Sequence, residues 1–272
     1  MALTSLPKEV CLPSRRSRYS RPEFPTPDDA TPVSLSEADA LPLLQSGEIT
    51  GGHRMPWGSN YTFLVWIDAG PGKYLRAIYK PRDGEKPLWD FPDGSLYKRE
   101  HATFQLSRIL GWPNVPLTLV RDGPYGVGSI QQYIECDPDV TYFDMVTDRA
   151  EELRPFAVFD LLANNADRKA GHCILGEDQR IWSIDHGLTL HISFKLRTVM
   201  TEFWGEDIPG PQLKDMEALL ARLDSQDSEM QAFAQNVESR EIQALSRRIL
   251  TMLENPALPR LDPYQNVPWP FV

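Results

Sequence analysis

The stretch Asn164–Gly187, NNADRKAGHCILGEDQRIWSIDHG, carries the pattern that decides the fold of this chain. Two short apolar segments, Cys173–Leu175 and Ile181–Ile184, are separated by the turn-like sequence Gly-Glu-Asp-Gln. This pattern predicts a tight hairpin with a polar cluster at each mouth. Asp185 follows the second segment directly, and the glycine that ends the stretch allows the chain to turn sharply.

Polar residues flank the predicted hairpin on both sides. Asp167 lies in the loop before it, His172 follows five residues later, and Asp185 comes just after the second strand. Phosphoryl transfer uses one carboxylate that orients the attacking hydroxyl and another that holds the metal bridging the phosphates of ATP. The order of these residues therefore favours kinase-type chemistry. For each piece alone, an ordinary solvated turn or a strand cap is the alternative.

A zinc site for hydrolysis is a second alternative for the same stretch. Five side chains of metal-binding type lie close together in the sequence: His172, Cys173, Asp185, His186 and His191. Neither an HExxH motif nor paired CxxC spacing is present, and this disfavours the zinc site.

Composition predicts a soluble globular protein with a substantial core. The chain has 272 residues, of which 41% are hydrophobic, enough for one large domain or two lobes. The longest apolar run, Phe63–Ile67, is too short to span a bilayer, and no signal-peptide pattern is visible. Three scattered cysteines do not indicate a disulfide framework. We therefore expect a cytoplasmic protein without stable membrane insertion.

Charge is unevenly distributed along the chain. The formal net charge is −10, yet the first 21 residues are basic. Residues 1–33 are rich in proline and poor in large apolar groups, which predicts a disordered tail. The acidic body disfavours nucleic acid as a partner; contact of the tail with an anionic surface is the alternative to a solvated arm. Order is expected from Ser34, where Ser34 and Glu37 have capping-box spacing for a helix.

A glycine-bearing hairpin follows. Strands are predicted at Glu48–Gly52 and Tyr61–Asp68, and the loop between them contains Gly58, Ser59 and Asn60. Backbone amides and small hydroxyls in such a loop can approach phosphates closely. These three residues are therefore candidates for nucleotide binding.

A lysine and a glutamate complete the predicted phosphate site. Lys80 ends the third predicted strand, Lys73–Lys80, where a kinase keeps the lysine that pairs with ATP phosphates. The helical periodicity of Ser95–Leu110 ends at Gly111, and Glu100 is its only acidic residue. We therefore expect an ion pair between Lys80 and Glu100.

Two further strands lead to the predicted junction between lobes. Val115–Arg121 and Gly128–Ile134 are predicted to form the sheet edge. Gln132, Tyr133 and Ile134 then lie where a nucleotide base would meet backbone amides, so all three are candidates for cofactor binding.

The rest of the chain is predicted to be mainly helical. Leu153–Asn164 leads into the hairpin region, and Leu213–Leu223 and Met230–Leu253 carry the apolar spacing of amphipathic helices. Lys195 and Arg197 follow Asp185 at a distance suited to facing an acceptor or a phosphate.

Seven segments together resemble the phosphatidylinositol 3-/4-kinase-like superfamily. They are GSNYTFLV, IYKP, REHATFQL, NVPLTLVRDG, GSIQQYIE, NNADRKAGH and SIDHGLTL, in this order across residues 48–192. The pattern is most similar to a bacterial family that resembles type II phosphatidylinositol 4-kinases.

The resemblance implies a two-lobed, protein-kinase-like α+β fold. Its N-terminal lobe, 34–136, would hold an antiparallel sheet plus a helix, and its C-terminal catalytic lobe, 137–272, would be mainly helical. ATP and a divalent metal, Mg²⁺ or Mn²⁺, would bind between the lobes.

The resemblance also implies roles for individual residues. Lys80 would hold the ATP phosphates and Glu100 would fix Lys80, while Asp167 would be the catalytic carboxylate and Asp185 a metal ligand. His172 stands where the family usually has a metal-binding asparagine. An imidazole there predicts a preference for Mn²⁺ over Mg²⁺ and, from an ordinary histidine pKa near 6.5, loss of activity below about pH 6.

A second departure concerns the acceptor. The palmitoylated cysteine-rich insert of eukaryotic type II enzymes is missing between Lys80 and Glu100, so a phosphoinositide is the less favoured substrate. We expect an ATP-dependent phosphotransferase acting on a protein hydroxyl or a small soluble acceptor. A nucleotide-binding pseudokinase that acts as a regulatory binding module is the alternative.

Overall fold

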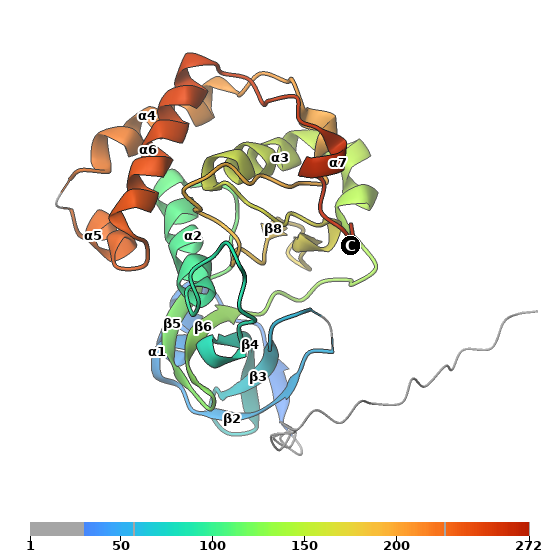
Figure 1. Cartoon of the computed structure of the whole chain (residues 1–272). Coiled ribbons are helices and arrows are strands. Elements are labelled where there is room, and N and C mark those ends of the chain that lie inside the picture. Colours follow the sequence, from blue (N-terminus) through green and yellow to red (C-terminus); the bar gives the residue numbers. More distant parts are fainter. Residues whose placement is uncertain (1–29, 57, 226, 272) are drawn as a thin grey trace, which may run out of the picture.

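The computed structural model describes residues 30–56, 58–225 and 227–271. A sheet-based lobe and a helical lobe meet along helix α2 (Leu96–Leu110), which contacts β5 and β6 on one side and α4 and α5 on the other (Figure 1). This mixed α+β architecture confirms the predicted fold class. No helix within these residues is long and apolar enough to cross a membrane.

The N-terminal lobe is built on a six-stranded sheet with the order β2-β3-β4-β6-β5. The long central strand β4 pairs with β6 along its second half and with β1, in parallel, along its first three residues. The strands are β1 (Thr31–Val33), β2 (Ile49–Arg54), β3 (Phe63–Asp68), β4 (Lys73–Pro81), β5 (Thr118–Gly123) and β6 (Gly126–Gln132).

Alternation along β4 sets the two faces of this sheet. Leu75, Ala77 and Tyr79 are buried in the core of the lobe, together with Leu44 of helix α1 (Glu37–Ser46). Because successive strand side chains point to opposite faces, Lys80 is turned away from this core. The alternation visible in the sequence therefore decides where the lysine lies.

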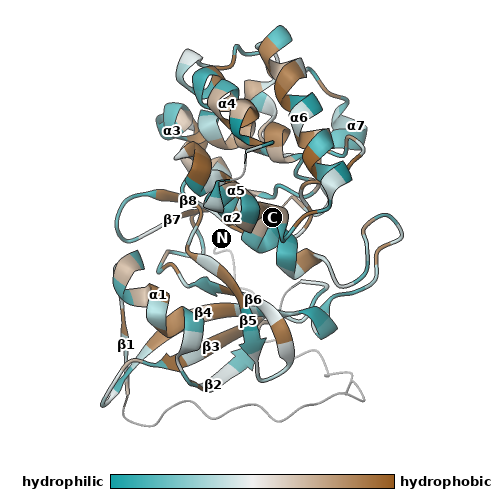
Figure 2. Cartoon of the chain, turned by 90° about the vertical axis from the view of Figure 1, so that its left-hand side faces the viewer, coloured by the Kyte–Doolittle hydropathy of each residue, from teal (hydrophilic) through white to brown (hydrophobic). Residues whose placement is uncertain are grey.

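The C-terminal lobe is mainly helical and has a small antiparallel hairpin (Figure 2). Its hairpin strands are β7 (Cys173–Leu175) and β8 (Ile181–Ser183), as the sequence predicts. Its helices are α3 (Tyr142–Ala163), α4 (Gly210–Arg222), α5 (Ser228–Ala234), α6 (Ser239–Glu254) and α7 (Pro263–Asn266).

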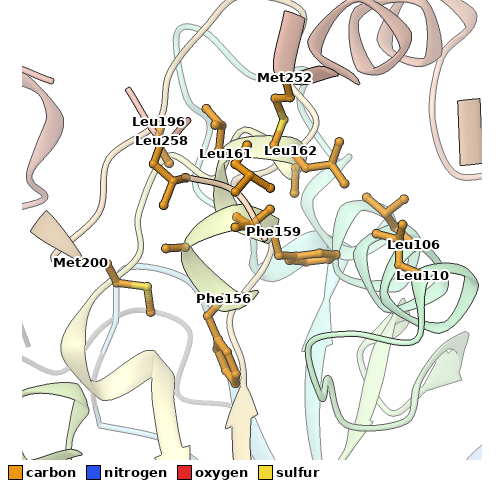
Figure 3. Packing of buried hydrophobic residues seen from close by; sticks show 14 of the residues in the cluster. Leu106, Leu110, Phe156, Phe159, Leu161, Leu162, Leu196, Met200, Met252 and Leu258 are labelled. Atoms are coloured by element: carbon orange, nitrogen blue, oxygen red, sulfur yellow. The ribbon is translucent and has the colours of Figure 1, made fainter. Parts of the chain in front are cut away.

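One apolar cluster holds α3 at the centre of this lobe. Figure 3 shows Phe159 and Leu162 of α3 beside Leu106 and Leu110 of α2, with Met252 of α6 nearby. Burial of each such side chain stabilises the fold by about 1.5–3 kcal/mol. The helix that leads into Asp167 is thus fixed against both neighbouring helices.

Near the N-terminus, the structure differs from the prediction at two element boundaries. The last residues of the predicted 1–33 tail, Thr31–Val33, form strand β1, because pairing with β4 satisfies their backbone groups; residues 1–29 lie outside the described residues. Helix α1 is capped by Ser36, whose hydroxyl accepts a hydrogen bond from the Asp39 N–H at 3.2 Å, rather than by Ser34.

Candidate functional site

A lysine shared by two carboxylates lies where the lobes meet. Lys80 Nζ donates hydrogen bonds to Glu100 Oε1 and, at 2.9 Å, to Asp185 Oδ1. The ion pair predicted between Lys80 and Glu100 is therefore present, and Asp185 joins it from 105 residues further along the chain. Burial disfavours the charged lysine, but Asp185 and Glu100 outweigh burial and raise the pKa of Lys80.

Glu100 ties the N-terminal lobe to the loop that carries Asp185. Its side chain is almost fully buried, and Oε2 accepts a hydrogen bond from the His186 N–H at 3.0 Å. Burial raises the pKa of Glu100, an effect that Lys80 opposes. Through Glu100, helix α2 therefore binds both the Lys80 ammonium group and the backbone of the residue after Asp185.

Asp185 is the most accessible member of the cluster. Its side chain is 49% exposed, and its backbone adopts a left-handed conformation with φ of 59°. Non-glycine residues held in this region cluster at functional sites. Burial tends to raise the pKa of its carboxyl, but the neighbouring Lys80 and His172 lower the pKa well below its ordinary value. The group is therefore ionised and open on one side.

His172 faces Asp185 with an unprotonated nitrogen. Its Nδ1 lies 3.0 Å from the Asp167 carbonyl oxygen, which can only accept, and 3.4 Å from the Lys169 backbone nitrogen, which can only donate; the shorter of these two contacts favours a proton on Nδ1. Its Nε2 lies 3.4 Å from Asp185 Oδ2. Burial, helped by Arg168, lowers the pKa of His172 to about 4, although Asp185 opposes this shift. His172 is therefore neutral at pH 7, and the predicted histidine titration near pH 6 is corrected.

The paired donor atoms fit one face of a divalent metal site. A carboxylate oxygen and a neutral imidazole nitrogen this close together can bind the same ion. Among the described residues, however, no group of three or more His, Cys, Asp or Glu side chains is placed to hold a metal. A metal at Asp185 and His172 would therefore take its remaining ligands from elsewhere, such as phosphate oxygens and water.

Asp167 lies in the loop after α3, about one-third exposed. Its N–H donates to Asn165 Oδ1 at 3.1 Å, and Lys169 Nζ lies 3.6 Å from its Oδ2. Burial raises the pKa of Asp167 to about 6, with Lys169 opposing the shift and Asp185 adding to it. A carboxylate with this pKa can take up a proton near neutral pH.

The residue that fixes this loop, Arg168, was not singled out from the sequence. It is fully buried and pairs with Asp160 of α3 through Nε and Nη2, at 2.7 and 2.9 Å. Its Nη1 donates to the carbonyls of His172 and Ile184, and its Nη2 to Ser183 Oγ at 2.7 Å. One guanidinium thus joins helix α3, the loop that carries Asp167 and the hairpin. The only sequence signal is Asp160 inside the apolar run of α3.

The predicted phosphate loop joins β2 to β3. Gly58 has φ of 90°, which favours glycine, and Asn60 Oδ1 accepts a hydrogen bond from the Lys86 N–H at 2.8 Å. Among the described residues, no hydrogen bond joins Gly58, Ser59 or Asn60 to Lys80. The loop and the lysine therefore belong to the same lobe, and no hydrogen bond among the described residues joins them.

In the predicted base-binding segment, two of the three backbone amides already donate hydrogen bonds within the N-terminal lobe. The Gln132 N–H donates to the Leu117 carbonyl at 2.9 Å, and the Tyr133 N–H to the Arg76 carbonyl at 3.2 Å. Within the described residues, the Ile134 N–H has no protein acceptor. Of the three predicted amides, that of Ile134 is therefore the one left for a ligand.

Solved structures share this fold of two lobes. The Golgi casein kinase with Mn/ADP bound matches with a TM-score of 0.52 and 16% identity, covering 81% of this chain and 76% of that one. The structure of hydra Fam20 with sugar matches with a TM-score of 0.50 and 14% identity, covering 79% and 86%.

Sequence relatives place the chain more narrowly. Protein Rv2133c of Mycobacterium tuberculosis (strain ATCC 25618 / H37Rv) is 36% identical over 267 residues, covering 85% of this chain and 95% of the relative. The chain therefore belongs to the family of that protein. Phosphatidylinositol 4-kinase gamma 2 of Arabidopsis thaliana is 25% identical over 249 residues, which cover 88% of this chain but 42% of that relative. No protein-family model matches the chain.

Proposed function

We propose that this protein is an ATP-dependent phosphotransferase acting on a protein hydroxyl or a small soluble acceptor. The observation that carries this proposal is the Lys80–Glu100–Asp185 cluster, with Asp167 and His172 beside it. These groups come from both lobes, and together they supply a phosphate-binding cation, a metal-binding carboxylate and a base.

Lys80 would bind the phosphates of ATP, and Glu100 would position it. In the structure the ammonium group is divided between Glu100 and Asp185. Arrival of phosphate oxygens would give Lys80 a new anionic partner and leave Asp185 to bind the metal.

The nucleotide would contact both ends of the N-terminal lobe. Gly58, Ser59 and Asn60 would cover the phosphates. The base would lie against the segment 132–134, where Ile134 offers a backbone amide without a protein acceptor. Among the residues inferred from the sequence, Ile134 would therefore make the direct hydrogen bond to the base.

Asp185 and His172 would hold a divalent ion, Mg²⁺ or Mn²⁺. When bound, such an ion neutralises charge that develops on the phosphates. The protein would prepare both side chains for metal binding. Lys80 keeps the Asp185 carboxyl ionised, and the contact of His172 Nδ1 with the Asp167 carbonyl favours the tautomer whose Nε2 can bind the ion.

Asp167 would orient the acceptor hydroxyl and take its proton. Arg168 and Asn165 position the loop on both sides of this carboxylate. Lys169 and the exposed Arg197 lower the pKa of Asp167 against the effect of burial, so the carboxylate stays largely ionised at pH 7.

We further propose that the family lies nearer to the phosphatidylinositol 3-/4-kinase-like group than to other kinases. The match to phosphatidylinositol 4-kinase gamma 2 over 249 residues supports this relationship. The acceptor remains a protein or small-molecule hydroxyl in this proposal, because no insert stands between Lys80 and Glu100.

A nucleotide-binding module without transfer activity is the second candidate. His172 is the observation that favours it, because an imidazole nitrogen is a poorer ligand for Mg²⁺ than an amide oxygen. The retained cluster around Lys80 favours the enzyme.

The test is incubation with γ-labelled ATP and either no metal, Mg²⁺ or Mn²⁺. Acceptors would include an unstructured protein substrate, small alcohols and phosphoinositide vesicles. We expect metal-dependent transfer to the protein or small-molecule acceptors, and its loss in Asp185→Asn. Nucleotide binding by calorimetry without any transfer would support the binding module instead.

A further inference from the structure

An apolar groove opens on the C-terminal lobe, apart from the Lys80 cluster. It has a volume of about 660 Å³ and is walled by Leu161 of α3, Met252 of α6 and Leu258 beyond α6. Figure 3 shows these three side chains on neighbouring parts of the lobe. Small-molecule sites typically occupy about 300–1,000 Å³ and combine mostly apolar walls with a few polar groups.

The rim of the groove leaves large apolar side chains in solvent. Ile192 and Phe194, from the segment that follows Asp185, are 41% and 53% exposed and line the same groove. Contiguous apolar surface of this kind marks binding sites in soluble proteins.

Two arginines on α6, Arg247 and Arg248, also line the groove. Neither forms an ion pair with any described residue. Arg248 Nε donates to the Leu162 carbonyl at 2.8 Å and Nη1 to the His191 carbonyl at 3.2 Å, while Nη2 is buried without a partner. Burial lowers the pKa of Arg248 to about 10, so it remains charged at pH 7.

Two fully buried arginines have what the partly buried Arg248 lacks. Arg168 pairs with Asp160, and Arg99 pairs with Glu241. A buried cation without a carboxylate partner carries an uncompensated desolvation cost. An anion supplied from outside would remove that cost at Arg248.

We propose that this groove binds a single amphiphile with a long alkyl chain and an anionic head, such as a fatty-acid carboxylate. The chain would occupy the apolar walls, and the head would pair with the guanidinium groups of Arg247 and Arg248. A neutral apolar ligand would use the walls but leave both cations unpaired. The site is independent of the proposed phosphotransfer.

The experiment measures binding of a fluorescent C16 carboxylate to the full chain, below its micelle concentration. The uncharged methyl ester of the same probe is the matched ligand. We expect the carboxylate to bind about tenfold or more tightly than the ester, because a charge-assisted pair is worth at least one such factor.

Three variants locate the site. Arg247→Glu reverses an exposed charge at the groove and should weaken carboxylate binding about tenfold while leaving the ester unchanged. Lys214→Glu makes the same reversal on an exposed position of α4 and should change neither affinity. Thr251→Trp places an indole at an exposed lining position and should weaken both probes.

Circular dichroism and the melting temperature establish that each variant is folded. Equal affinity for carboxylate and ester, together with no effect of Arg247→Glu, would show apolar binding only and overturn the proposed head-group contact. Unchanged binding in Thr251→Trp would overturn the groove as the site. Binding to phosphatidic acid vesicles without binding of the monomeric probe would replace the single amphiphile by a membrane surface.

Discussion

Two ionic clusters near the loop that carries Asp167 obtain their hydrogen-bond partners in different ways. Arg168 is fully buried, and Asp160 together with backbone and hydroxyl oxygens supplies its acceptors from within the chain. Lys80 is shared between buried Glu100 and Asp185, which is half exposed. The first cluster is closed, whereas the second has an open side.

This difference predicts whether a substitution in each cluster changes the stability of the fold or the binding and turnover of a ligand. A closed, buried cluster holds chain segments together, and its loss leaves a charge without solvent or partner. An open cluster keeps part of its interaction capacity for a ligand, so its loss should affect binding and turnover more than folding.

The largest effect, a loss of unfolding free energy, is expected from Arg168→Met. It leaves Asp160 buried without its partner, and breaking a buried pair in this way costs about 3–5 kcal/mol. Urea unfolding measures the loss. Arg180→Met is the matched control, because Arg180 is 66% exposed and lies 3.8 Å from Asp178; its effect should stay within about 1 kcal/mol. Similar unfolding free energies for the two variants would remove the distinction between the clusters.

Asp185→Asn should have the opposite pattern, with a large loss of turnover and little loss of stability. It removes the charge that is proposed to bind the metal, and loss of one group that stabilises transition-state charge costs about 10²–10³ in turnover. Asparagine tolerates the left-handed backbone of this position nearly as well as aspartate, so the unfolding free energy should change little. Steady-state transfer of label and urea unfolding on the same preparation measure both effects. Wild-type turnover would contradict the assigned role of Asp185.

The fold was predictable because its signals are local. The alternation of Leu75, Ala77 and Tyr79 places Lys80 on the opposite face of β4, and the helical spacing up to Gly111 places Glu100 on the following helix. Each of these patterns is complete within about ten to fifteen residues, the length over which periodicity is informative.

The contacts between residues far apart in the sequence were not predictable, because no local pattern signals them. The partner of Arg99 is Glu241, 142 residues away, and β1 pairs with a strand 42 positions further on. No local pattern specifies such pairs. The backbone bonds that occupy the Gln132 and Tyr133 amides likewise depend on the register of β6 against its neighbours, which a single sequence does not fix.

A third prediction concerns pH and the open side of the site. With the pKa of Asp167 raised to about 6, protonation below that pH removes the base, so the transfer rate should fall about tenfold per pH unit on the acid side. The pKa of His172 is lowered to about 4, so this histidine stays neutral across the same range. The pH–rate profile should therefore show one acid limb near pH 6, and His172→Asn should leave it in place. A limb that moves in His172→Asn would assign the titration to the histidine.

The smallest expected effect is on the choice of metal. His172 Nε2 lies 3.4 Å from Asp185 Oδ2, and the 3.0 Å contact of Nδ1 with the Asp167 carbonyl favours the tautomer in which Nε2 carries no proton. Mg²⁺ favours oxygen ligands, whereas Mn²⁺ accepts an imidazole nitrogen more readily. Wild-type protein should therefore transfer phosphate faster with Mn²⁺ than with Mg²⁺. His172→Asn should shift the ratio of the two rates toward Mg²⁺ by about tenfold, the lower end of the effect of changing the surroundings of a bound metal.

Rates with each metal at saturating concentration, measured at pH 7.5 or above where Asp167 is ionised, isolate this effect from the acid limb. His101→Asn is the matched control, since His101 is also a partly buried histidine of lowered pKa but bonds to the Thr118 carbonyl in the N-terminal lobe. Its metal ratio should equal that of the wild type. If His172→Asn also kept the wild-type ratio, His172 would serve to fix the loop through Asp167, and Asp185 would hold the metal with phosphate and water alone.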